Sequence, residues 1–326
     1  MELVAHPDNL REAFLRAARG KSRMTEVQHF RLHVDEQLER MGEELLSGSY
    51  RFGAYHTFEV YEPKKRIICA ASFRDRVAMH AMMRICHPVF DGYQVFDSYA
   101  SRVGKGTHKA IERVRSLIRP DMWFAKLDAC VYFSSIDHAI LLSQLHRLFK
   151  DVRLLSCFGQ LIATHSDGWH RGLPIGNLTS QYFANHYLAV ADHYLKEQLH
   201  APHAIRYMDD TLLLDTDRSR LLHTVEAYTA FVGSELHLSL HEPVVNRCVA
   251  GIPFLGYVVH PHRISLNTRS RHRFRHRLRD LTAAFTAGHI TETAYQQRLT
   301  ALYAVLGYAR AAPLCRSVAA EQGLLP

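Results

Sequence analysis

Apolar residues recur at helical spacing through the first 54 residues, with charged residues between them. One series begins at Leu10, a second begins at Phe30, and Gly48 follows the second series. Glycine commonly ends a helix because it adopts the left-handed conformation without steric cost. The pattern predicts two helices within residues 9–48, as part of an N-terminal helical segment that we place at residues 1–54.

The pattern changes in the next part of the chain. From Tyr55 to Ile68, β-branched and aromatic residues flank the basic turn Pro63-Lys64-Lys65-Arg66, which predicts a hairpin with a charged tip. Helical spacing returns from Phe73 to Phe90. The loop Arg102-Val103-Gly104-Lys105-Gly106 then precedes a predicted helix from Thr107 to Ile118.

Short apolar runs in the remainder of the chain predict strands. They lie at Trp123–Leu127, Ala204–Met208, Thr211–Leu214 and Phe254–His260. Helices are expected to fill the intervals, including residues 137–200. The expected fold class is therefore α+β.

A small basic helical unit is expected after Asn267. Four apolar residues keep the spacing of one helix face, namely Phe274, Leu278, Leu281 and Phe285. A second series with the same spacing consists of Tyr295, Leu299, Leu302 and Leu306. We therefore expect two helices in residues 267–326, the first of which packs one apolar seam against another element.

Composition adds a polyanionic partner to this picture. The 326 residues are 47% hydrophobic, which is ample for a sizeable core, and 40 Lys and Arg exceed 32 Asp and Glu. Six cysteines include no C-x-x-C pair, so neither a disulfide framework nor a zinc site is expected, and a reducing cytoplasmic location fits. No apolar run approaches 18 residues, so no membrane partner is expected.

Six arginines occupy alternate positions from Arg269 to Arg279, with no acidic residue between them. An ordinary solvated helix face is one interpretation. The uninterrupted positive charge favours contact with nucleic-acid phosphates instead. Arg271, Arg275 and Arg279 are our candidates for that contact.

The clearest chemical signal is a set of three carboxylates. Asp209 and Asp210 lie between two predicted strands, and Asp128 follows another predicted strand. Asp in a turn is often only a local hydrogen-bonding residue. However, carboxylates crowded at strand ends repel one another unless divalent cations are bound. Such a site suits two-metal phosphoryl transfer.

These motifs resemble those of reverse transcriptases, in the correct order, from about residue 55 to residue 260. Lys126-Leu127-Asp128 with Tyr132-Phe133 resembles the first palm motif, and Tyr207-Met208-Asp209-Asp210 resembles the second. Phe254-Leu255-Gly256-Tyr257 resembles the primer-grip hairpin. The resemblance implies a right-hand polymerase with fingers at 55–122, a palm at 123–266 and a thumb at 267–326.

The same resemblance implies an activity, its cofactor and its partners. The enzyme would be an RNA-directed DNA polymerase that copies template RNA from a DNA primer with dNTPs. Two Mg²⁺ ions would be held by Asp128 and Asp209, with Asp210 in support and Mn²⁺ as a substitute. Tyr207 and the primer-grip residues would contact nucleic acid.

Further residues are implied as nucleotide contacts. Lys65 and Arg66 match the basic fingers residues that hold the triphosphate, and Arg102 and Lys105 lie in a further basic fingers motif. Each cation could equally be a solvated surface charge. Phe133 matches the aromatic steric gate that excludes a ribose 2′-hydroxyl, and it could also be a core residue.

The segment from Gly172 to Gln181 discriminates between branches of the family. Most reverse transcriptases carry glutamine before the second glycine and proline after the serine, whereas this chain has Ile175 before Gly176 and Gln181 after Ser180. This resembles the enzymes of diversity-generating retroelements, which copy a template RNA with errors at adenines. Apolar bulk in place of a polar reader is expected to loosen nucleotide selection.

Alternatives remain open at this point. Related bacterial reverse transcriptases act in antiphage defence with a structured noncoding RNA, whereas a diversity-generating system would use an accessory protein subunit. An RNA-templated RNA polymerase is disfavoured by the bulk of Phe133. A non-catalytic RNA-binding or splicing cofactor would not need all three carboxylates.

Overall fold

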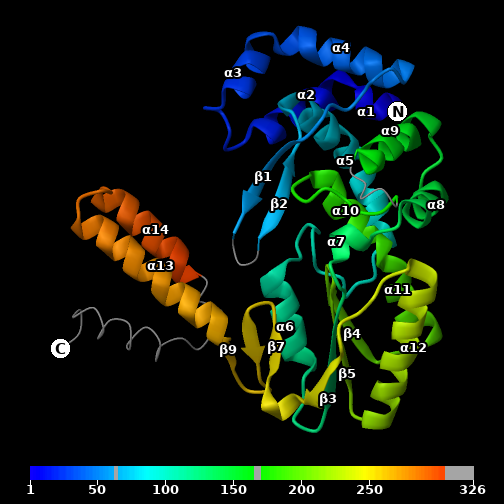
Figure 1. Ribbon diagram of the computed structural model, residues 1–326, viewed down its shortest axis with the longest axis vertical. Coiled ribbons are helices and arrows are strands. Elements are labelled where there is room, and N and C mark those ends of the chain that lie inside the picture. The colour runs from blue at the N-terminus through cyan, green and yellow to red at the C-terminus, as the bar shows by residue number, and fades with distance from the viewer. Residues whose placement is uncertain (62–64, 165–169, 305–326) are drawn as a thin grey trace.

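The computed structural model describes residues 1–61, 65–164 and 170–304, in which helices pack with three separate sheets (Figure 1). Among the described residues, no helix is both long enough and apolar enough to cross a lipid bilayer. The α-helices are α1 (Glu2–Ala5), α2 (Pro7–Ala18), α3 (Thr25–Leu32), α4 (Val34–Ser47), α5 (Phe73–Tyr93), α6 (Thr107–Leu117), α7 (Tyr132–Ser135), α8 (His138–Leu148), α9 (Val152–Ala163), α10 (Leu178–Tyr187), α11 (Ala189–His193), α12 (Arg218–Leu236), α13 (Thr268–Thr286) and α14 (Glu292–Ala304).

The N-terminal segment contains one more helix break than the sequence predicted. Residues 9–48 hold α2, α3 and α4, because His33 leaves the helical conformation at φ −124° and its N–H bonds back to the Phe30 carbonyl. The predicted stop at Gly48 is confirmed, since this glycine caps α4 in the left-handed region at φ 74°.

The predicted hairpin and the two helices that follow it are confirmed. Strand β1 (His56–Val60) pairs antiparallel with β2 (Arg66–Ala70), and Val60 lies opposite Arg66. Pro63 and Lys64 of the predicted basic turn lie outside the described residues. Helix α5 follows β2 and α6 follows the glycine-containing loop.

The central sheet contains the three predicted strands that adjoin the carboxylates. Its order is β4 (His203–Tyr207), β5 (Asp210–Asp215), β3 (Trp123–Asp128) and β6 (Val244–Arg247), all antiparallel. Side chains alternate between its faces. One face packs on α12 and belongs to the larger hydrophobic cluster, and the other packs on α6 in a second cluster.

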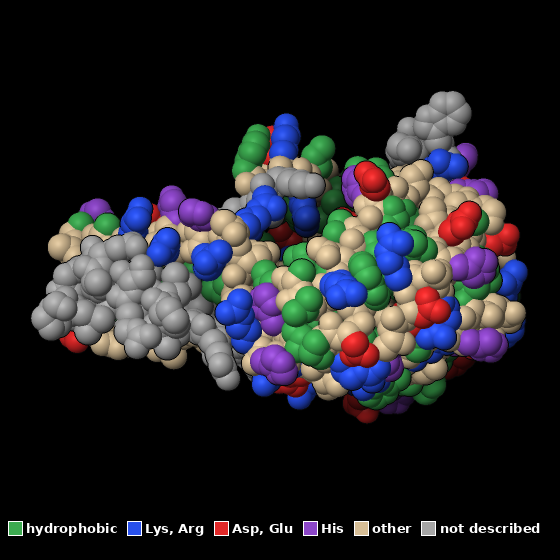
Figure 2. Space-filling model, turned by 90° about the horizontal axis from the view of Figure 1, so that it is seen from below, with side chains coloured by type: hydrophobic (Ala, Val, Ile, Leu, Met, Phe, Trp, Pro, Cys, Tyr) green, Lys and Arg blue, Asp and Glu red, His purple; other side chains and the backbone are tan. Residues whose placement is uncertain are grey.

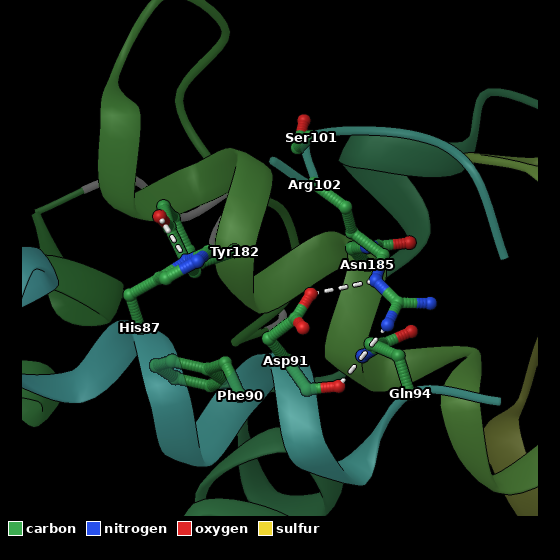
Figure 3. Close-up of a pocket in the computed structure, with 8 residues that line it drawn as sticks. All are labelled: His87, Phe90, Asp91, Gln94, Ser101, Arg102, Tyr182 and Asn185. Carbon is green, nitrogen blue, oxygen red and sulfur yellow. Dashed lines mark hydrogen bonds and ion pairs between the residues drawn. The ribbon is translucent and has the colours of Figure 1, made fainter. Parts of the chain in front are cut away.

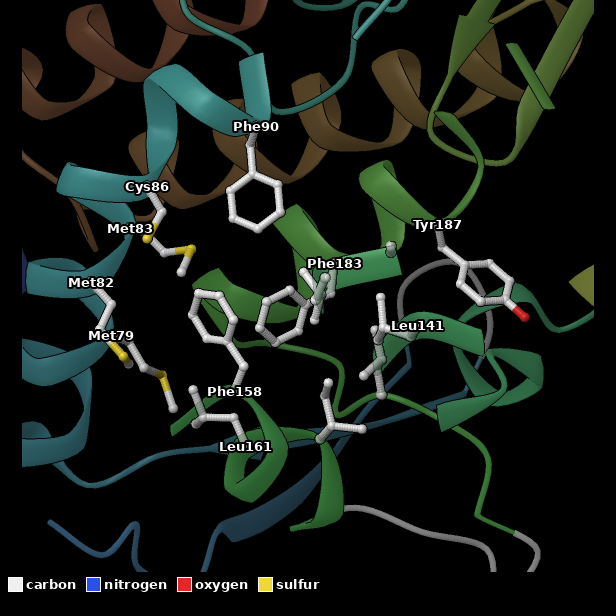
Figure 4. Packing of buried hydrophobic residues seen from close by; sticks show 14 of the residues in the cluster. Met79, Met82, Met83, Cys86, Phe90, Leu141, Phe158, Leu161, Phe183 and Tyr187 are labelled. Atoms are coloured by element: carbon white, nitrogen blue, oxygen red, sulfur yellow. The ribbon is translucent and has the colours of Figure 1, made fainter. Parts of the chain in front are cut away.

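The larger hydrophobic cluster packs the helices that surround one face of the central sheet, including α5, α9 and α10. Met79, Met82 and Met83 of α5 lie with Phe158 of α9 and Phe183 of α10 in this core (Figure 4). The Phe158 and Phe183 rings meet edge to face at 5.2 Å between centroids. Met side chains fill the irregular gaps between such rings.

The predicted strand from Phe254 to His260 is wrong as a single element. Two short strands, β7 (Ile252–Phe254) and β8 (Tyr257–Val259), form a hairpin to which β9 (Ile264–Leu266) adds a third strand. The turn places Leu255 at φ 49° and Gly256 at φ 88°, which breaks the extended run. The hairpin itself agrees with the primer-grip resemblance.

Helices α13 and α14 pack together as an arm that follows β9 (Figure 1). The predicted seam is partly buried: Phe274 and Leu278 join the second cluster, while Phe285 stacks on Tyr295 at 4.5 Å. Leu306 and the remainder of the predicted unit to residue 326 lie outside the described residues. The boundaries 1–54, 55–122, 123–266 and 267–326 stay predictions.

A buried arginine joins the central sheet to the helices around it. Arg206 of β4 is 1% exposed, and its Nε lies 2.8 Å from both carboxylate oxygens of Asp192. Its other donors reach polar groups of the palm helices and of the loop after α5: Asn185 Oδ1 and carbonyl, Gln94 Oε1, Ser98 Oγ and the Met208 carbonyl. Each donor is therefore satisfied away from water, as burial of a guanidinium requires.

We predict that Asp192→Ala lowers the free energy of unfolding by about 3–5 kcal/mol, because Arg206 cannot lose its proton and would stay buried without a counterion. Urea unfolding followed by circular dichroism measures the change. Arg11→Ala, which removes an exposed ion pair with Asp35, is the control and should cost less than about 1 kcal/mol. Equal losses in the two variants would contradict the assigned importance of the buried pair.

Candidate active site

The strand register brings the three predicted carboxylates to one end of the central sheet. Asp128, the last residue of β3, lies directly opposite Asp210, the first residue of β5. Asp209 lies in the tight turn between β4 and β5, after Met208 at φ 56°. The Arg206 guanidinium donates to the Met208 carbonyl at 2.8 Å, so the buried network also fixes this turn.

The electrostatics of this end show an excess of negative charge. Burial raises the pKa of Asp209, and the charges of Asp128 and Asp210 raise it further. The positive charge of Arg66, on the fingers hairpin, acts in the opposite direction and lowers the pKa of Asp209. The charge of the β1–β2 hairpin therefore acts on the turn between β4 and β5 that carries Asp209.

Asp210 differs from the other two carboxylates in having a cation beside it. Lys126 Nζ lies 2.8 Å from Asp210 Oδ1. Burial raises the pKa of Asp210, while the hydrogen bond and charge of Lys126 lower it in opposition. Lys126 therefore compensates part of the charge of Asp210, and the ion pair engages Asp210 rather than Asp128 or Asp209.

This donor set fits divalent metal ions that are completed by a substrate. In the described parts of the chain, no three His, Cys, Asp or Glu side chains form a ready-made metal cage. Mg²⁺ is commonly bound by one or two carboxylates together with water and substrate phosphates. Asp128 and Asp209 can supply the protein part of such a site.

Phe133 occupies a packed position beside this end of the sheet. Its ring is half-buried against the larger cluster and meets the buried Tyr132 edge to face at 5.9 Å. The Tyr132 hydroxyl donates to the Ala184 carbonyl, and the Phe133 carbonyl accepts from Leu173 N–H at 2.8 Å. A ring held in this way could exclude a substituent, as a steric gate must.

The discriminating segment rests on the fingers hairpin. The Ile175 carbonyl accepts from the Cys69 N–H of β2 at 2.8 Å. A Cβ at Gly176, which has φ 117°, would lie 2.9 Å from Ile68 Cγ2, so only glycine fits this close approach. Gln181 is exposed, and its Oε1 accepts from Ser101 Oγ at 3.2 Å.

Lys65 and Arg66 are both exposed at the hairpin, as expected for residues that could meet a triphosphate. Lys65 Nζ lies 2.7 Å from Glu59 Oε1, an ion pair with both partners largely in solvent. Such a pair is weak and easily exchanged for a phosphate. The charge of Arg66 lowers the pKa of Asp209, which supports Arg66 as the hairpin cation that acts on the carboxylates.

Arg102 has a different setting from the one that the sequence suggested. Its Nε donates to Asp91 Oδ1 at 2.7 Å, and its terminal nitrogens donate to the carbonyls of Val95, Ser98 and Asp91 (Figure 3). The side chain is only 10% exposed. Arg102 thus fixes the loop after α5, and its assignment to the incoming nucleotide stays a prediction.

Lys105 is also engaged within this loop. Its Nζ donates to the Phe96 carbonyl at 2.7 Å and lies 3.6 Å from the centroid of the Phe96 ring. Burial and the charge of Arg102 lower the pKa of Lys105. Lys105 is thus held at Phe96, and its assignment to the nucleotide stays a prediction.

The four residues of the hairpin that resembles a primer grip differ in their exposure to solvent. Phe254 and Tyr257 are buried in the second cluster, so only the half-buried turn of Leu255 and Gly256 faces outward. Tyr207 packs against the same cluster, and its hydroxyl accepts from Thr107 Oγ1 at 3.2 Å. The side chains of Phe254, Tyr257 and Tyr207 therefore pack in the second cluster, beside the hairpin turn.

The arginines of α13 are mostly exposed, with Arg275 half-buried and Arg271 donating to Thr268 Oγ1 at 3.3 Å. Figure 2 shows Lys and Arg side chains along the arm of α13 and α14 and around the hollow beside the β1–β2 hairpin. Arg271 and Arg279 are exposed and Arg275 is half-buried, and the phosphate contacts of all three stay predictions.

Three residues at this site escaped sequence reasoning. Arg206 looked like an ordinary charged strand residue, and Lys126 was noted only as part of a motif. Val131 adopts the left-handed conformation at φ 40° and is 75% exposed between Asp128 and Phe133. A β-branched residue there is strained, which is typical of loops at functional sites. Only the position of Val131 between two motif residues could have indicated it.

The fold and the carboxylate end of its sheet define a right-hand nucleic-acid polymerase. A family model described as reverse transcriptase (RNA-dependent DNA polymerase) matches residues 61–259. The chain belongs to this family, and its domain is that of an RNA-directed DNA polymerase, an enzyme class that acts with divalent metal ions.

Two curated relatives are similar in sequence over half of the chain. Protein YkfC of Escherichia coli is 30% identical over 183 residues, which cover 52% of this chain and 47% of that protein. The putative COX1/OXI3 intron 1 protein of Saccharomyces cerevisiae is 23% identical over 171 residues, which cover 50% of this chain and 20% of that protein. The chain thus spans less than half the length of either relative.

Solved structures with a similar fold include telomerases. Apo telomerase from Candida tropicalis aligns with a TM-score of 0.53 at 10% identity, over 68% of this chain and 49% of that chain. Telomerase from the same organism in complex with a TWJ fragment of telomeric RNA aligns with a TM-score of 0.50 at 9% identity, over 70% and 48%. At such identity the likeness concerns the fold.

We predict that Asp209→Asn, without divalent cations, unfolds a few degrees higher than the wild type, since about 1 kcal/mol of relieved repulsion shifts Tm by about 2–4 °C in chains approaching this size. Mg²⁺ should raise the wild-type Tm and raise that of the variant less. Thermal denaturation with and without MgCl₂ measures both effects. Asp121→Asn, at an exposed site, is the control and should respond to Mg²⁺ like the wild type. An undiminished response in Asp209→Asn would remove Asp209 from the metal site.

Proposed function

We propose that this chain synthesises DNA on an RNA template by two-metal nucleotidyl transfer. One observation carries the proposal: Asp128, Asp209 and Asp210 lie at one end of the central sheet, where Lys126 pairs with Asp210, while the charge of Arg66 on the β1–β2 hairpin lowers the pKa of Asp209. This arrangement suits a substrate that brings both metal ions and phosphates. The partners would be template RNA, a DNA primer and dNTPs.

The residues would divide the work as follows. Asp128 and Asp209 would hold two Mg²⁺ ions, or Mn²⁺ as a substitute, and Asp210, which pairs with Lys126, would support that site. When bound, the ions would activate the primer 3′-hydroxyl and stabilise the leaving pyrophosphate. Arg66 and Lys65 would bind the triphosphate, and Phe133 would exclude the ribose 2′-hydroxyl. These assignments rest on the contacts described above.

The arm of α13 and α14 would contact the template-primer duplex. Its exposed arginines, Arg271 and Arg279 among them, suit phosphates regardless of base sequence. The turn at Leu255 and Gly256 is the exposed part of the primer-grip hairpin. We assign both elements to duplex positioning.

For the biological role we propose a diversity-generating retroelement that works with an accessory protein subunit. The support is Ile175, an apolar residue held beside the fingers strand by its bond to Cys69, in place of a polar reader of the base pair. The alternative is an antiphage defence enzyme that uses a structured noncoding RNA. A non-catalytic RNA-binding cofactor is the alternative from another class.

We predict that the protein extends a DNA primer on an RNA template with dNTPs in Mg²⁺, and that Asp128→Asn reduces this extension at least 1000-fold because one metal ligand is weakened. Gel-resolved primer extension measures the rate. RNA binding and circular dichroism of the variant should match the wild type. Extension by Asp128→Asn at the wild-type rate would refute the two-metal assignment.

Phe133→Val should admit ribonucleotides, because a smaller side chain leaves room for the 2′-hydroxyl. We expect the ratio of NTP to dNTP kcat/KM to rise roughly 10- to 100-fold, the scale of one lost packing contact in a specificity pocket. Phe133→Tyr keeps the bulk and is the matched control. If Phe133→Val loses stability without a change in this ratio, the gate lies elsewhere.

Ile175→Gln should lower the error frequency several-fold, since a restored polar contact contributes on the order of 1 kcal/mol to selection. Wild-type errors should concentrate opposite template adenine. Deep sequencing of cDNA made on a defined RNA measures both enzymes, with Ile175→Leu as the apolar control. Uniformly few errors in the wild type would contradict the mutagenic role while leaving DNA synthesis intact.

A further inference from the structure

A large aromatic side chain is exposed on the loop between α5 and α6. Phe96 is 65% exposed, although Phe normally contributes to the core. Val103 of the same loop is 83% exposed. An exposed aromatic that is also held in place is more informative than scattered surface apolar residues, which are common.

Two cations hold the Phe96 ring. Lys105 Nζ lies 3.6 Å from the ring centroid and donates to the Phe96 carbonyl, and the Arg113 guanidinium lies 5.6 Å from the same centroid. Cation–π contacts at these distances are attractive. Lys105 is thereby partly desolvated, and burial lowers its pKa. The ring, the ammonium and the guanidinium form a preorganised group, which we call the Phe96 platform.

The platform carries an excess of positive charge. Arg113 pairs with Asp97 at 2.8 Å and Lys196 lies 3.8 Å from the same carboxylate, so Asp97 serves two cations while Lys105 has no carboxylate within an ion-pair distance among the described residues. Burial and then the charges of Arg113 and Arg119 lower the pKa of nearby His203, which agrees with positive potential at this edge.

The platform lies outside the candidate active site. Phe96 lies in the turn that is closed by the Ser98 N–H bond to the Val95 carbonyl, and the next residue, Asp97, accepts from Arg206 N–H of the edge strand β4. Asp209 lies in the turn that follows β4.

We propose that the Phe96 platform binds single-stranded RNA by stacking one unpaired base on the face of the ring opposite Lys105, with the adjacent phosphates near Lys105 and Arg113. Aromatic faces beside basic side chains are the usual means of binding single strands without sequence preference. A duplex, whose bases are already stacked, cannot use the ring. The inference deepens the proposed function, on which it rests, by adding a second RNA contact beyond the reaction centre.

The test is binding of a fluorescein-labelled 12-nucleotide unstructured RNA and of the matching RNA duplex, without dNTPs or divalent cations, by fluorescence anisotropy. Phe96→Ala should weaken single-strand binding roughly 5- to 100-fold, the range found for loss of one stacked base, and should leave duplex binding unchanged. Phe96→Trp should retain single-strand affinity. Leu32→Ala, which removes an apolar side chain that is 78% exposed on α3, is the control and should change neither.

Three outcomes would overturn the inference: unchanged single-strand affinity in Phe96→Ala, an equal loss for the duplex, or a loss in Phe96→Trp as large as in Phe96→Ala. Circular dichroism confirms that each variant is folded. Primer extension by the wild type is measured separately. RNA binding through Phe96 without extension would refute the polymerase proposal alone, and extension with unaltered Phe96→Ala binding would refute the platform alone.

Discussion

The ion pair between Arg206 and Asp192 is the constraint on which the rest of this polymerase fold depends. A guanidinium that is 1% exposed must have every donor satisfied, and the groups that satisfy it come from α10, α11, the loop after α5 and the catalytic turn. The backbone of Arg206 adds bonds to Asp97 and Tyr99. One side chain therefore sets the relative position of the edge strand, the helices behind it and the turn that carries Asp209, because none can move without stranding a buried charge.

Charge at the reaction centre is arranged in the opposite way. The buried arginine is fully paired, whereas Asp128 and Asp209 are crowded and only partly compensated, with Lys126 committed to Asp210. Such imbalance is costly in the protein alone and is relieved by cations that arrive with a substrate. The Arg206 network and the carboxylates are linked through the turn at Met208, whose carbonyl accepts from Arg206. The fully hydrogen-bonded arginine therefore holds the turn that carries the crowded Asp209.

Most of the framework around the site could be predicted from the sequence, since apolar periodicity located β3, β4, β5, the fingers hairpin and α5. The roles of single cations could not be predicted. Arg102 and Lys105 lie in a basic motif, yet Arg102 is bound to Asp91 and Lys105 to Phe96, contacts that depend on chain segments brought together only by folding. The prediction of one strand from Phe254 to His260 was wrong because two residues with positive φ interrupt the strand, and only one of them is a glycine. Arg206 was missed because burial of a charged residue has no local signature.

The contact of Gly176 with β2 also has an evolutionary consequence. A side chain at this position would meet Ile68 at 2.9 Å and the Cys69 carbonyl at 3.2 Å, in a backbone conformation that other residues rarely adopt. A smaller residue at Ile68 would leave both the contact with the Cys69 carbonyl and the positive φ in place. We therefore expect substitutions to be tolerated more readily at Ile175 than at Gly176. Under the role that we propose for Ile175, nucleotide selection could then change without disturbing the contact of this segment with β2.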